Sequence, residues 1–341
     1  MRLLVLTQKV NKSALILGFF HGWLEAMSRE FESIDVVALG VGEYDLPQNV
    51  RVYSLGKERG AGRLSKLINF YRLVFGLKNK YDAVFVHMNP EYLVLAGWLW
   101  KLWKKPVYLW YVHKFSNPIL TYASFWVDKI FTANATSCQL KNNKKVVIVG
   151  HGINTELFFP AEKRQEGRFS ILSVGRMSPI KRYEITLQAL DLLISKYGFL
   201  DFRYTIVAPI VTKEGESYRK RILDMINANP KLKERTELIS GVAHGGLCGY
   251  YNNAHLLVHT GEGGADKAVL EAMSCALPVL ASSEAFLFLP DEYKAKKDDV
   301  NELAEKILWL KNNWKLDYTL RGAVEKDYSL TAFFKKIRIN L

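Results

Sequence analysis

Short apolar runs alternate along the chain with longer stretches in which apolar residues recur every three or four positions. The short runs predict strands and the longer stretches predict helices. In the first half, strands are expected at Arg2–Thr7, Ile34–Ala38, Arg51–Ser54, Ala83–His87, Val107–His113, Ile130–Ala133 and Val146–Val149, with helices at Gly18–Phe31 and Leu64–Leu77. Strands separated by helices are typical of parallel βαβ units, so this half predicts a doubly wound sheet.

The same alternation begins again at Phe169. Strands are expected at Ser170–Val174, Tyr204–Val207, Glu237–Ile239, Leu256–His259 and Pro278–Ala281, with helices at Tyr183–Lys196, Ser217–Asn227, Lys267–Cys275 and Val300–Asn312. A polar run follows Phe159 and Pro160, which places the junction between two domains there. The pattern predicts an α/β protein of two Rossmann-like domains, residues 1–158 and 159–325, with a helix at 326–341 that returns to the N-terminal domain.

Composition agrees with two globular domains and a reducing compartment. The chain has 341 residues, of which 49% are hydrophobic and 24% charged, enough for two cores. Its three cysteines, Cys138, Cys248 and Cys275, form no CxxC pair, which argues against a disulfide framework or a zinc site. The opening apolar run is too short for a signal peptide, and no stretch reaches the roughly 18 apolar residues that span a bilayer. A cytoplasmic location is therefore expected.

The positive charge is concentrated in the first half. The whole chain carries +13, and residues 51–160 alone contain sixteen Lys and Arg against five Asp and Glu, a net +11. Such a surface suits an anionic partner such as phospholipid headgroups, nucleic acid or a phosphorylated acceptor. A basic surface that merely keeps the protein soluble is the alternative.

The segment from Ser173 to Lys181 (Ser-Val-Gly-Arg-Met-Ser-Pro-Ile-Lys) ends a strand and enters a helix. Gly175 permits a tight turn, and Arg176 and Lys181 follow five residues apart. Two cations in such a loop can converge on a diphosphate and stabilise a departing nucleotide. A solvated basic loop would give the same pattern.

A second glycine-rich segment, Gly261–Met273, leads into another helix. Asp266 is its expected N-cap, and free backbone N–H groups at a helix start form an anion site. The donor-binding candidates in this segment are Gly263, Gly264, Ala265, Asp266, Lys267 and Glu271. Glu271 lies within an apolar helix, where a charge needs a partner and a ribose diol would serve. A surface glutamate beside a glycine turn is the other interpretation.

Polar residues at the ends of expected strands mark further candidates. His87, Asn89 and His113 follow strands of the first sheet, and His151 lies between two glycines near the domain junction. Ligands of doubly wound sheets gather at the carboxyl ends of strands, so these four residues are candidate cleft residues.

Three segments together resemble one family. Val-Ile-Val-Gly-His-Gly-Ile-Asn-Thr-Glu-Leu-Phe, then Ser-Val-Gly-Arg-Met-Ser-Pro-Ile-Lys, then Lys-Ala-Val-Leu-Glu-Ala-Met-Ser-Cys-Ala-Leu-Pro-Val-Leu-Ala-Ser occur in the order and spacing of the GT-B glycosyltransferases of family 4, the retaining "group 1" transferases. The resemblance is most specific between Gly150 and Ser282, and the N-terminal half looks like a bacterial subset. It implies a GT-B fold with a cleft between an N-terminal acceptor-binding domain and a C-terminal nucleotide-sugar-binding domain.

The resemblance also implies roles for single residues. Arg176 and Lys181 match the cation pair that holds the donor diphosphate, and Glu271 matches the second glutamate of a paired motif, which binds the donor ribose. His113 matches a histidine near the reacting carbon of the sugar, so His113, Arg176 and Lys181 are the expected catalytic residues.

Two positions depart from the family pattern. The first glutamate of the pair should lie eight residues before Glu271, where this chain has Gly263; Glu262 is one residue out of register, and Asp266 is the other nearby carboxylate. The glycine that usually follows the lysine is Arg182 here. The first departure concerns the identity of the donor sugar, and the second adds a third cation near the diphosphate.

The implied reaction transfers a hexose from a nucleoside-diphosphate sugar to a glycan or lipid-linked acceptor with retention, in cell-surface polysaccharide or glycolipid assembly. Retention by front-face attack needs no protein nucleophile, because the departing diphosphate oxygen takes the acceptor proton. No carboxylate cluster marks a metal site, so neither an essential metal nor a cofactor is expected. An inactive homologue that serves as a nucleotide-sugar-binding or scaffold protein is the alternative.

Two other classes fit less well. An epimerase or dehydrogenase would carry GxGxxG after the first strand, which is absent here. The chain also lacks helix-turn-helix, RNP and zinc patterns, which argues against a nucleic-acid partner.

The segment from Gly97 to Tyr111 is rich in aromatic residues and lysine. Trp98, Trp100, Trp103, Tyr108 and Trp110 alternate there with Lys101, Lys104 and Lys105. Aromatic rings beside lysines favour the headgroup zone of a bilayer. This predicts peripheral binding at an anionic membrane surface, the inner face of the plasma membrane; an ordinary helix–strand core with a lysine turn is the alternative.

Overall fold

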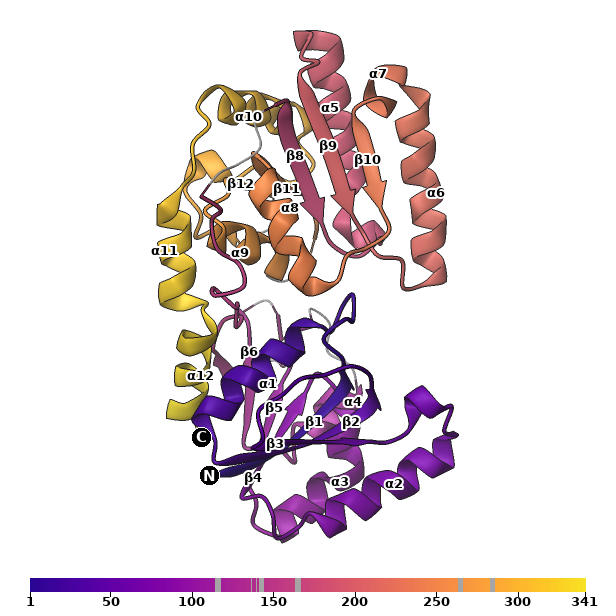
Figure 1. Ribbon diagram of the computed structural model, residues 1–341, viewed down its shortest axis with the longest axis vertical. Helices are drawn as coiled ribbons and strands as arrows, with labels where there is room; N and C mark the ends of the chain where they lie inside the picture. Colours follow the sequence, from indigo (N-terminus) through magenta and orange to yellow (C-terminus); the bar gives the residue numbers. More distant parts are fainter. Residues whose placement is uncertain are drawn as a thin grey trace. The chain divides into compact units, whose positions relative to one another are not determined.

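The computed structural model describes residues 1–113, 118–135, 137–138, 140, 144–162, 167–262, 266–282 and 286–341. The chain forms two compact units, one of Met1–Gly152 with Leu330–Leu341 and one of Ile153–Ser329. The division lies at residue 152 rather than at 158, and the return to the first unit begins at residue 330 rather than at 326. Each unit is an α/β domain built on a parallel sheet (Figure 1).

The N-terminal unit has seven parallel strands in the order β3-β2-β1-β4-β5-β6-β7. They are β1 (Arg2–Val10), β2 (Ser33–Val41), β3 (Val50–Ser54), β4 (Ala83–His87), β5 (Val107–Trp110), β6 (Lys129–Thr132) and β7 (Val146–Ile148). The helices are α1 (Phe19–Glu30), α2 (Arg63–Gly76), α3 (Glu91–Leu102), α4 (Pro118–Ala123) and α12 (Leu330–Ile339), with a short 3-10 turn η1 (Lys57–Arg59).

Alternation along the strands gives this sheet two buried faces. Leu4 and Leu6 of β1 face a core that includes α2, α3 and α4, whereas Leu3 and Val5 face a core that includes α1 and α12. Strands buried on both sides read as continuous apolar runs, which is why they were recognisable in the sequence.

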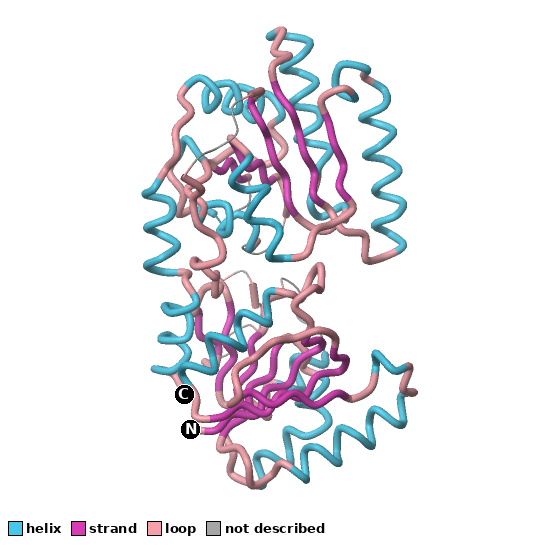
Figure 2. The backbone as a smooth tube through the Cα atoms, in the orientation of Figure 1, coloured by secondary structure: helices cyan, strands magenta, loops and turns pink. Residues whose placement is uncertain are grey.

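The C-terminal unit has five parallel strands in the order β10-β9-β8-β11-β12. They are β8 (Phe169–Val174), β9 (Phe202–Val207), β10 (Thr236–Ile239), β11 (Leu256–His259) and β12 (Val279–Ala281). The helices are α5 (Tyr183–Tyr197), α6 (Lys213–Ala228), α7 (Pro230–Lys233), α8 (Leu247–Asn253), α9 (Lys267–Ser274), α10 (Val300–Asn312) and α11 (Tyr318–Asp327), with 3-10 turns η2 (Pro179–Lys181), η3 (His244–Gly246) and η5 (Asp291–Tyr293). Figure 2 shows helices around the strands of this unit.

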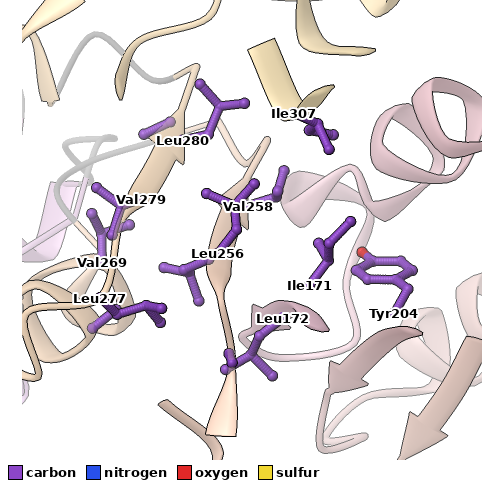
Figure 3. Packing of buried hydrophobic residues seen from close by; sticks show 14 of the residues in the cluster. Ile171, Leu172, Tyr204, Leu256, Val258, Val269, Leu277, Val279, Leu280 and Ile307 are labelled. Atoms are coloured by element: carbon purple, nitrogen blue, oxygen red, sulfur yellow. The ribbon is translucent and has the colours of Figure 1, made fainter. Parts of the chain in front are cut away.

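One hydrophobic core holds these elements together. Side chains of β8, β11 and β12 pack with Val269 of α9 and Ile307 of α10 (Figure 3). Several helices begin at a polar N-cap: Thr212, Asp266, Asp299 and Asp317 each accept a hydrogen bond from a backbone N–H in the first turn. The doubly wound fold predicted from the sequence is therefore confirmed.

The aromatic and lysine-rich segment is mostly core, contrary to the predicted membrane surface. Trp100 and Trp110 are buried, and the Trp100 indole donates to the Tyr81 hydroxyl at 3.0 Å. The Lys105 ammonium donates to the Tyr81 carbonyl. Only Trp98, at 48% exposure, is an exposed large apolar residue among the five aromatic residues named for that surface. The segment spans α3 and β5, so Trp100 packs between α3 and the sheet, whereas Trp110 packs on the opposite face of the sheet against Trp23 and Phe333.

The strand expected at Val107–His113 ends earlier, at Trp110. Beyond it the Tyr111 N–H donates to the Phe131 carbonyl, and the His113 N–H donates to Ser137. His113 consequently lies in a loop, held by a single bridge to Cys138.

Candidate functional site

The order of the C-terminal sheet places two loops at one edge. The chain runs from β8 outward through β9 to β10 and then resumes on the other side of β8 with β11. In parallel sheets, ligands bind where the strand order reverses, outside the carboxyl ends of the two adjacent strands. Here the loop after Val174 and the loop after His259 meet at that point. The Glu262 N–H donates to the Ile180 carbonyl at 2.8 Å, and the Thr260 hydroxyl donates to the Arg182 carbonyl at 2.8 Å.

Lys181 forms an ion pair with Asp266, which lies 85 residues away in the sequence. The His259 Nε2 atom lies 3.2 Å from the same carboxylate, and Asp266 also caps α9. Burial raises the pKa of the Asp266 carboxyl, but the Lys181 ammonium and the His259 ring outweigh it and hold that pKa well below its usual value. The carboxylate is therefore ionised at neutral pH beside the lysine expected to bind the diphosphate.

Gly175 makes room for the Lys181 side chain. A Cβ atom there would lie 3.0 Å from Lys181 Cε and 3.0 Å from the Tyr183 hydroxyl. A larger residue would displace the side chain of Lys181. The glycine expected to supply a turn thus also permits a close approach.

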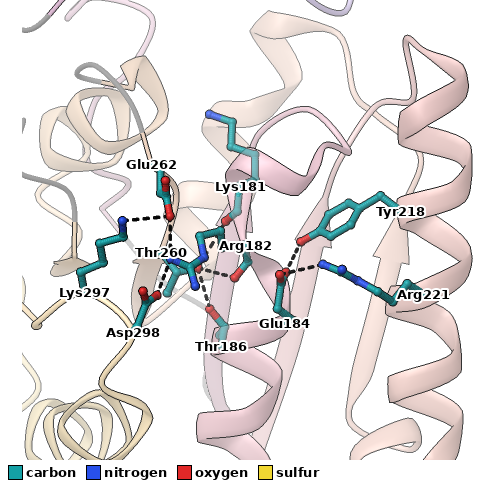
Figure 4. A network of polar contacts seen from close by, with 10 residues as sticks. All are labelled: Lys181, Arg182, Glu184, Thr186, Tyr218, Arg221, Thr260, Glu262, Lys297 and Asp298. Atoms are coloured by element: carbon teal, nitrogen blue, oxygen red, sulfur yellow. Dashed lines mark hydrogen bonds and ion pairs between the residues drawn. The ribbon is translucent and has the colours of Figure 1, made fainter. Parts of the chain in front are cut away.

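Arg182 lies at the centre of a second network (Figure 4). Its guanidinium contacts Glu262 at 2.7 Å and also pairs with Asp298, while Lys297 lies 3.1 Å from Glu262. Its backbone is left-handed, with φ 51° and ψ 44°, the region that favours glycine. Arg182 is therefore neutralised by two carboxylates rather than free to act as a third cation. Beside this network, Glu184 binds Tyr218 and Arg221 of α6 and thereby fixes the start of α5.

Glu271 is buried, with 4% of its surface exposed. Its two carboxylate oxygens lie 2.9 Å from His244 Nε2 and 2.9 Å from the Tyr251 hydroxyl. Burial raises the pKa of the Glu271 carboxyl, but His244, Lys267 and Tyr251 together lower it below its usual value. The interpretation as a surface glutamate is wrong, because the helix turns this side chain into the protein. Each carboxylate oxygen can accept a second hydrogen bond.

Lys267 is half-buried between the two carboxylates of the site. Burial lowers the pKa of its ammonium well below the usual value, and Glu271 and Asp266 oppose that effect.

Arg176, in contrast, is exposed in the loop after β8 and forms no ion pair with any described residue. Its carbonyl accepts a hydrogen bond from Tyr183 at 3.4 Å. The remaining donor candidates, Gly263, Gly264 and Ala265, lie outside the described residues.

The candidates of the N-terminal unit lie in different surroundings. His87 is 1% exposed, stacks on Phe20 with ring centroids 4.1 Å apart, and lies 3.1 Å from the Thr7 hydroxyl. His151 is buried beside Trp110. Both placements are those of core histidines, so neither side chain is presented to a ligand.

Asn89 and His113 are more accessible. His113 is exposed just beyond β5. Asn89 lines a groove of about 260 Å³ together with Arg63, Lys66 and Glu91 and several apolar residues. This groove lies at the carboxyl ends of β2, β3 and β4, where a doubly wound sheet binds ligands.

Sequence reasoning missed three residues of the site: His244, Tyr251 and His259. His259 ends strand β11 as His87 ends strand β4, so its position at a strand end was a signal that could have identified it. His244 and Tyr251 lie in and after a short turn whose sequence, His-Gly-Gly-Leu-Cys-Gly-Tyr-Tyr, carries no helical or strand period. Only the packing of α8 against α9 shows their role.

Across the described ranges, no group of three or more His, Cys, Asp or Glu side chains is arranged to hold a metal ion. No helix in the same ranges is long and apolar enough to cross a membrane. All three cysteines are free thiols.

Comparison with known proteins relates the C-terminal unit to one family. Residues 168–313 match the family described as "Glycosyl transferases group 1". An uncharacterized glycosyltransferase of Methanocaldococcus jannaschii is 27% identical over 220 residues, which are 61% of this chain and 56% of that protein. The chain therefore aligns with little more than half of that relative.

Solved structures show the fold over the whole chain. HepE of Anabaena in complex with UDP-glucose has a TM-score of 0.76 at 15% identity and covers 100% of this chain and 99% of its own. Sucrose-phosphate synthase from Thermosynechococcus elongatus has a TM-score of 0.73 at 16% identity and covers 100% and 98%. Residues 168–313 of this chain therefore match the group 1 glycosyltransferases, and the chain shares the GT-B fold of the solved structures.

Proposed function

We propose that this protein is a retaining glycosyltransferase that transfers a hexose from a nucleoside-diphosphate sugar to an acceptor hydroxyl. The observation that carries the proposal is the pairing of Lys181 with Asp266 at the reversal point of the C-terminal sheet. This pairing puts the Lys181 ammonium beside the N-terminus of α9, and the ammonium and the helix N-terminus each attract a diphosphate. The comparison proteins that bind UDP and UDP-glucose support the same donor class.

In the proposed reaction the protein mainly supplies charge and position. As the glycosidic bond to the diphosphate breaks, negative charge grows on the departing oxygen, and the Lys181 ammonium stabilises it. That oxygen then takes the proton of the acceptor hydroxyl as the new bond forms on the same face of the sugar. Arg176 would turn from solvent onto the diphosphate, and Glu271 would accept a hydrogen bond from the ribose. We place the acceptor in the N-terminal unit, near His113 and the groove beside Asn89.

Lys181 must exchange partners for this to happen. In the described arrangement the Asp266 carboxylate neutralises the Lys181 ammonium, and a bound diphosphate would compete with Asp266 for that ammonium. His259 then becomes the group that compensates the Asp266 carboxylate. The donor-binding energy is therefore expected to be reduced by the cost of separating Lys181 from Asp266.

The test is a transfer assay with UDP-, GDP- and ADP-sugars, preceded by a thermal-shift screen that selects the nucleotide. Anomeric configuration of the product, read by NMR, decides retention. A product with inverted configuration, or no turnover of any stabilising donor with glycan and lipid-linked acceptors, would contradict the proposal. Assembly of a cell-surface polysaccharide or glycolipid is the role we expect for such an enzyme.

One observation favours a second candidate, an inactive protein that binds nucleotide sugars. Both carboxylates nearest to the missing first glutamate are already engaged, Glu262 by Arg182 and Lys297 and Asp266 by Lys181 and His259. Neither is then available to hold the donor sugar. Tight donor binding without hydrolysis or transfer would favour this candidate.

A further inference from the structure

Helix α2 exposes an apolar stripe. Leu64, Ile68 and Phe75 are 70%, 59% and 54% exposed. Their spacing puts them on one side of the helix, with half-buried Tyr71 between them. The core side of the same helix buries Phe70 and Val74. A helix that is apolar on its outer side as well as its inner side has more apolar surface than its own domain uses.

The neighbouring helix α3 continues this surface. Val94, Trp98 and Leu102, spaced four residues apart, are 38%, 48% and 70% exposed. The Tyr71 hydroxyl donates to the Leu95 carbonyl at 3.0 Å, and the rings of Phe75 and Trp103 meet edge-on at 5.5 Å. Figure 1 shows the two helices next to each other on the sheet. We call the joined surface the α2–α3 face; its members are Leu64, Leu67, Ile68, Phe75, Val94, Trp98 and Leu102.

The segment that carries the α2–α3 face has an excess of positive charge. Residues 63–105 contain eight Lys and Arg and two Asp and Glu. Arg63, Arg72 and Lys104 are exposed and form no ion pair with any described residue. Lys78 lies over the Trp103 ring at 4.7 Å, and Lys101 is 3.5 Å from Asp128. Most of this charge is therefore not neutralised within the unit.

We propose that the α2–α3 face binds the surface of an anionic lipid bilayer. Exposed leucine, isoleucine, phenylalanine and tryptophan side chains enter the boundary between headgroups and acyl chains, and the flanking arginines and lysines contact the lipid phosphates. The surface differs from the one predicted from the sequence, because Trp100 and Trp110 are core and α2 supplies four of the seven apolar residues. The inference does not depend on the proposed glycosyl transfer.

Charge argues against the other occupants. In a symmetric dimer the face would meet itself, and the exposed Arg63, Arg72 and Lys104 of each copy would repel those of the other. A nucleic acid would satisfy the charge but leave the exposed apolar side chains without a partner. An anionic bilayer satisfies both features at once.

Vesicle sedimentation tests the binding. Wild-type protein is expected to sediment with vesicles of phosphatidylcholine containing 30% phosphatidylglycerol at low salt, and to be released when salt is raised several-fold. Vesicles of phosphatidylcholine alone should bind at least tenfold less. Wild-type protein that stays in the supernatant with anionic vesicles at low salt would overturn the proposal.

Two variants locate the surface. Leu64→Ser/Ile68→Ser/Leu102→Ser removes exposed apolar side chains without touching the core, and should lower the partition coefficient at least tenfold. Arg63→Gln/Arg72→Gln should lower it about 30-fold on anionic vesicles, since each basic residue near such a surface contributes about a fivefold increase. Matched controls are Trp309→Ser, at 50% exposure on α10, and Lys213→Gln/Lys220→Gln on α6. Equal losses in the controls would refute the α2–α3 face as the binding surface.

Depth of insertion gives a readout that a structural defect would not produce. Brominated lipids should quench part of the tryptophan fluorescence, and Trp98→Phe should remove most of that part while Trp309→Phe leaves it. Quenching that is unchanged in Trp98→Phe would place the membrane elsewhere. Sedimentation velocity without lipid should show no self-association; a dimer that is lost in the triple serine variant would instead assign the face to a second copy.

Discussion

The guanidinium of Arg182 lies 2.7 Å from the carboxylate of Glu262, while the Arg182 backbone has a left-handed φ of 51°. A family resemblance led us to expect glycine at this position, and the backbone explains that preference. A side chain in this conformation costs roughly 1–2 kcal/mol. Arg182 offsets part of the cost through Glu262 and Asp298.

Replacing Arg182 separates these two effects. Arg182→Gly removes the ion pairs but relieves the backbone, so the free energy of unfolding should stay within about 1 kcal/mol of wild type. Arg182→Ala removes the same ion pairs and keeps the strained backbone, so it should be about 1 kcal/mol less stable than the glycine variant. Urea unfolding of both variants gives the comparison. An alanine variant as stable as the glycine variant would show that the backbone is not strained.

Lys181→Ala should lower kcat/KM by about 10²–10³-fold, the usual loss when one preorganised charge is removed from a transition state. The control is Lys220→Ala, an exposed lysine of α6 that is remote in sequence from the site loops. Lys181→Ala leaves the Asp266 carboxylate with one partner fewer, which destabilises the fold as well as removing the charge. The double variant Lys181→Met/Asp266→Asn removes both charges of the pair, so an activity loss in this variant reports on catalysis rather than on folding. Activity of a folded Lys181→Ala protein within about twofold of wild type would remove the diphosphate role.

Glu271→Gln should weaken binding of the free nucleoside diphosphate about tenfold or more, and weaken the intact donor by the same factor. The reason is that a ribose hydroxyl loses a charged acceptor, while the sugar is not involved. Glu271→Ala should do the same but also destabilise the unit, because His244 and Tyr251 lose a buried partner. Isothermal titration measures both affinities. An unchanged nucleoside-diphosphate affinity in Glu271→Gln would rule out ribose binding.

The Asp266 carboxyl should make the C-terminal unit acid-sensitive. Its pKa is lowered in the folded protein, whereas an unfolded aspartate titrates at about 3.9. The stabilisation is therefore fully present above about pH 4 and is lost as the pH falls through the lower folded value. Asp266→Asn, which keeps an N-cap oxygen, should flatten the fall in stability below pH 4. Unfolding curves between pH 6 and pH 2 for the two proteins measure this; parallel curves would contradict it.

The variant Asp266→Asn also tests whether the ion pair with Lys181 competes with nucleotide binding. At neutral pH, Asp266→Asn should bind free nucleoside diphosphate more tightly than wild type, because Lys181 no longer has to leave a carboxylate. A several-fold lower dissociation constant by titration is expected. Weaker binding would mean that Asp266 contacts the nucleotide sugar itself rather than competing with it.

The sequence by itself determined the class of fold and the two loops of the candidate site. Strands buried on both faces appear as continuous apolar runs, and helices between them appear as a three-to-four residue period, so their alternation is a local property of the chain. The glycine at 175, the cation at 181 and the N-cap at 266 are likewise local signals, and the Asp266 N-cap is confirmed.

The tertiary structure alone decided which side chains meet. The strand order puts β11 beside β8, and that long-range pairing joins Lys181 to Asp266 and Arg182 to Glu262 across about 80 residues. His244 and Tyr251 reach Glu271 only because α8 packs on α9. In the same way, packing sends Trp100 into the core and leaves Ile68 and Leu102 exposed. Periodicity reports that a residue is apolar or polar, but the partner that compensates a buried charge, or covers an apolar side chain, depends on elements distant in the sequence.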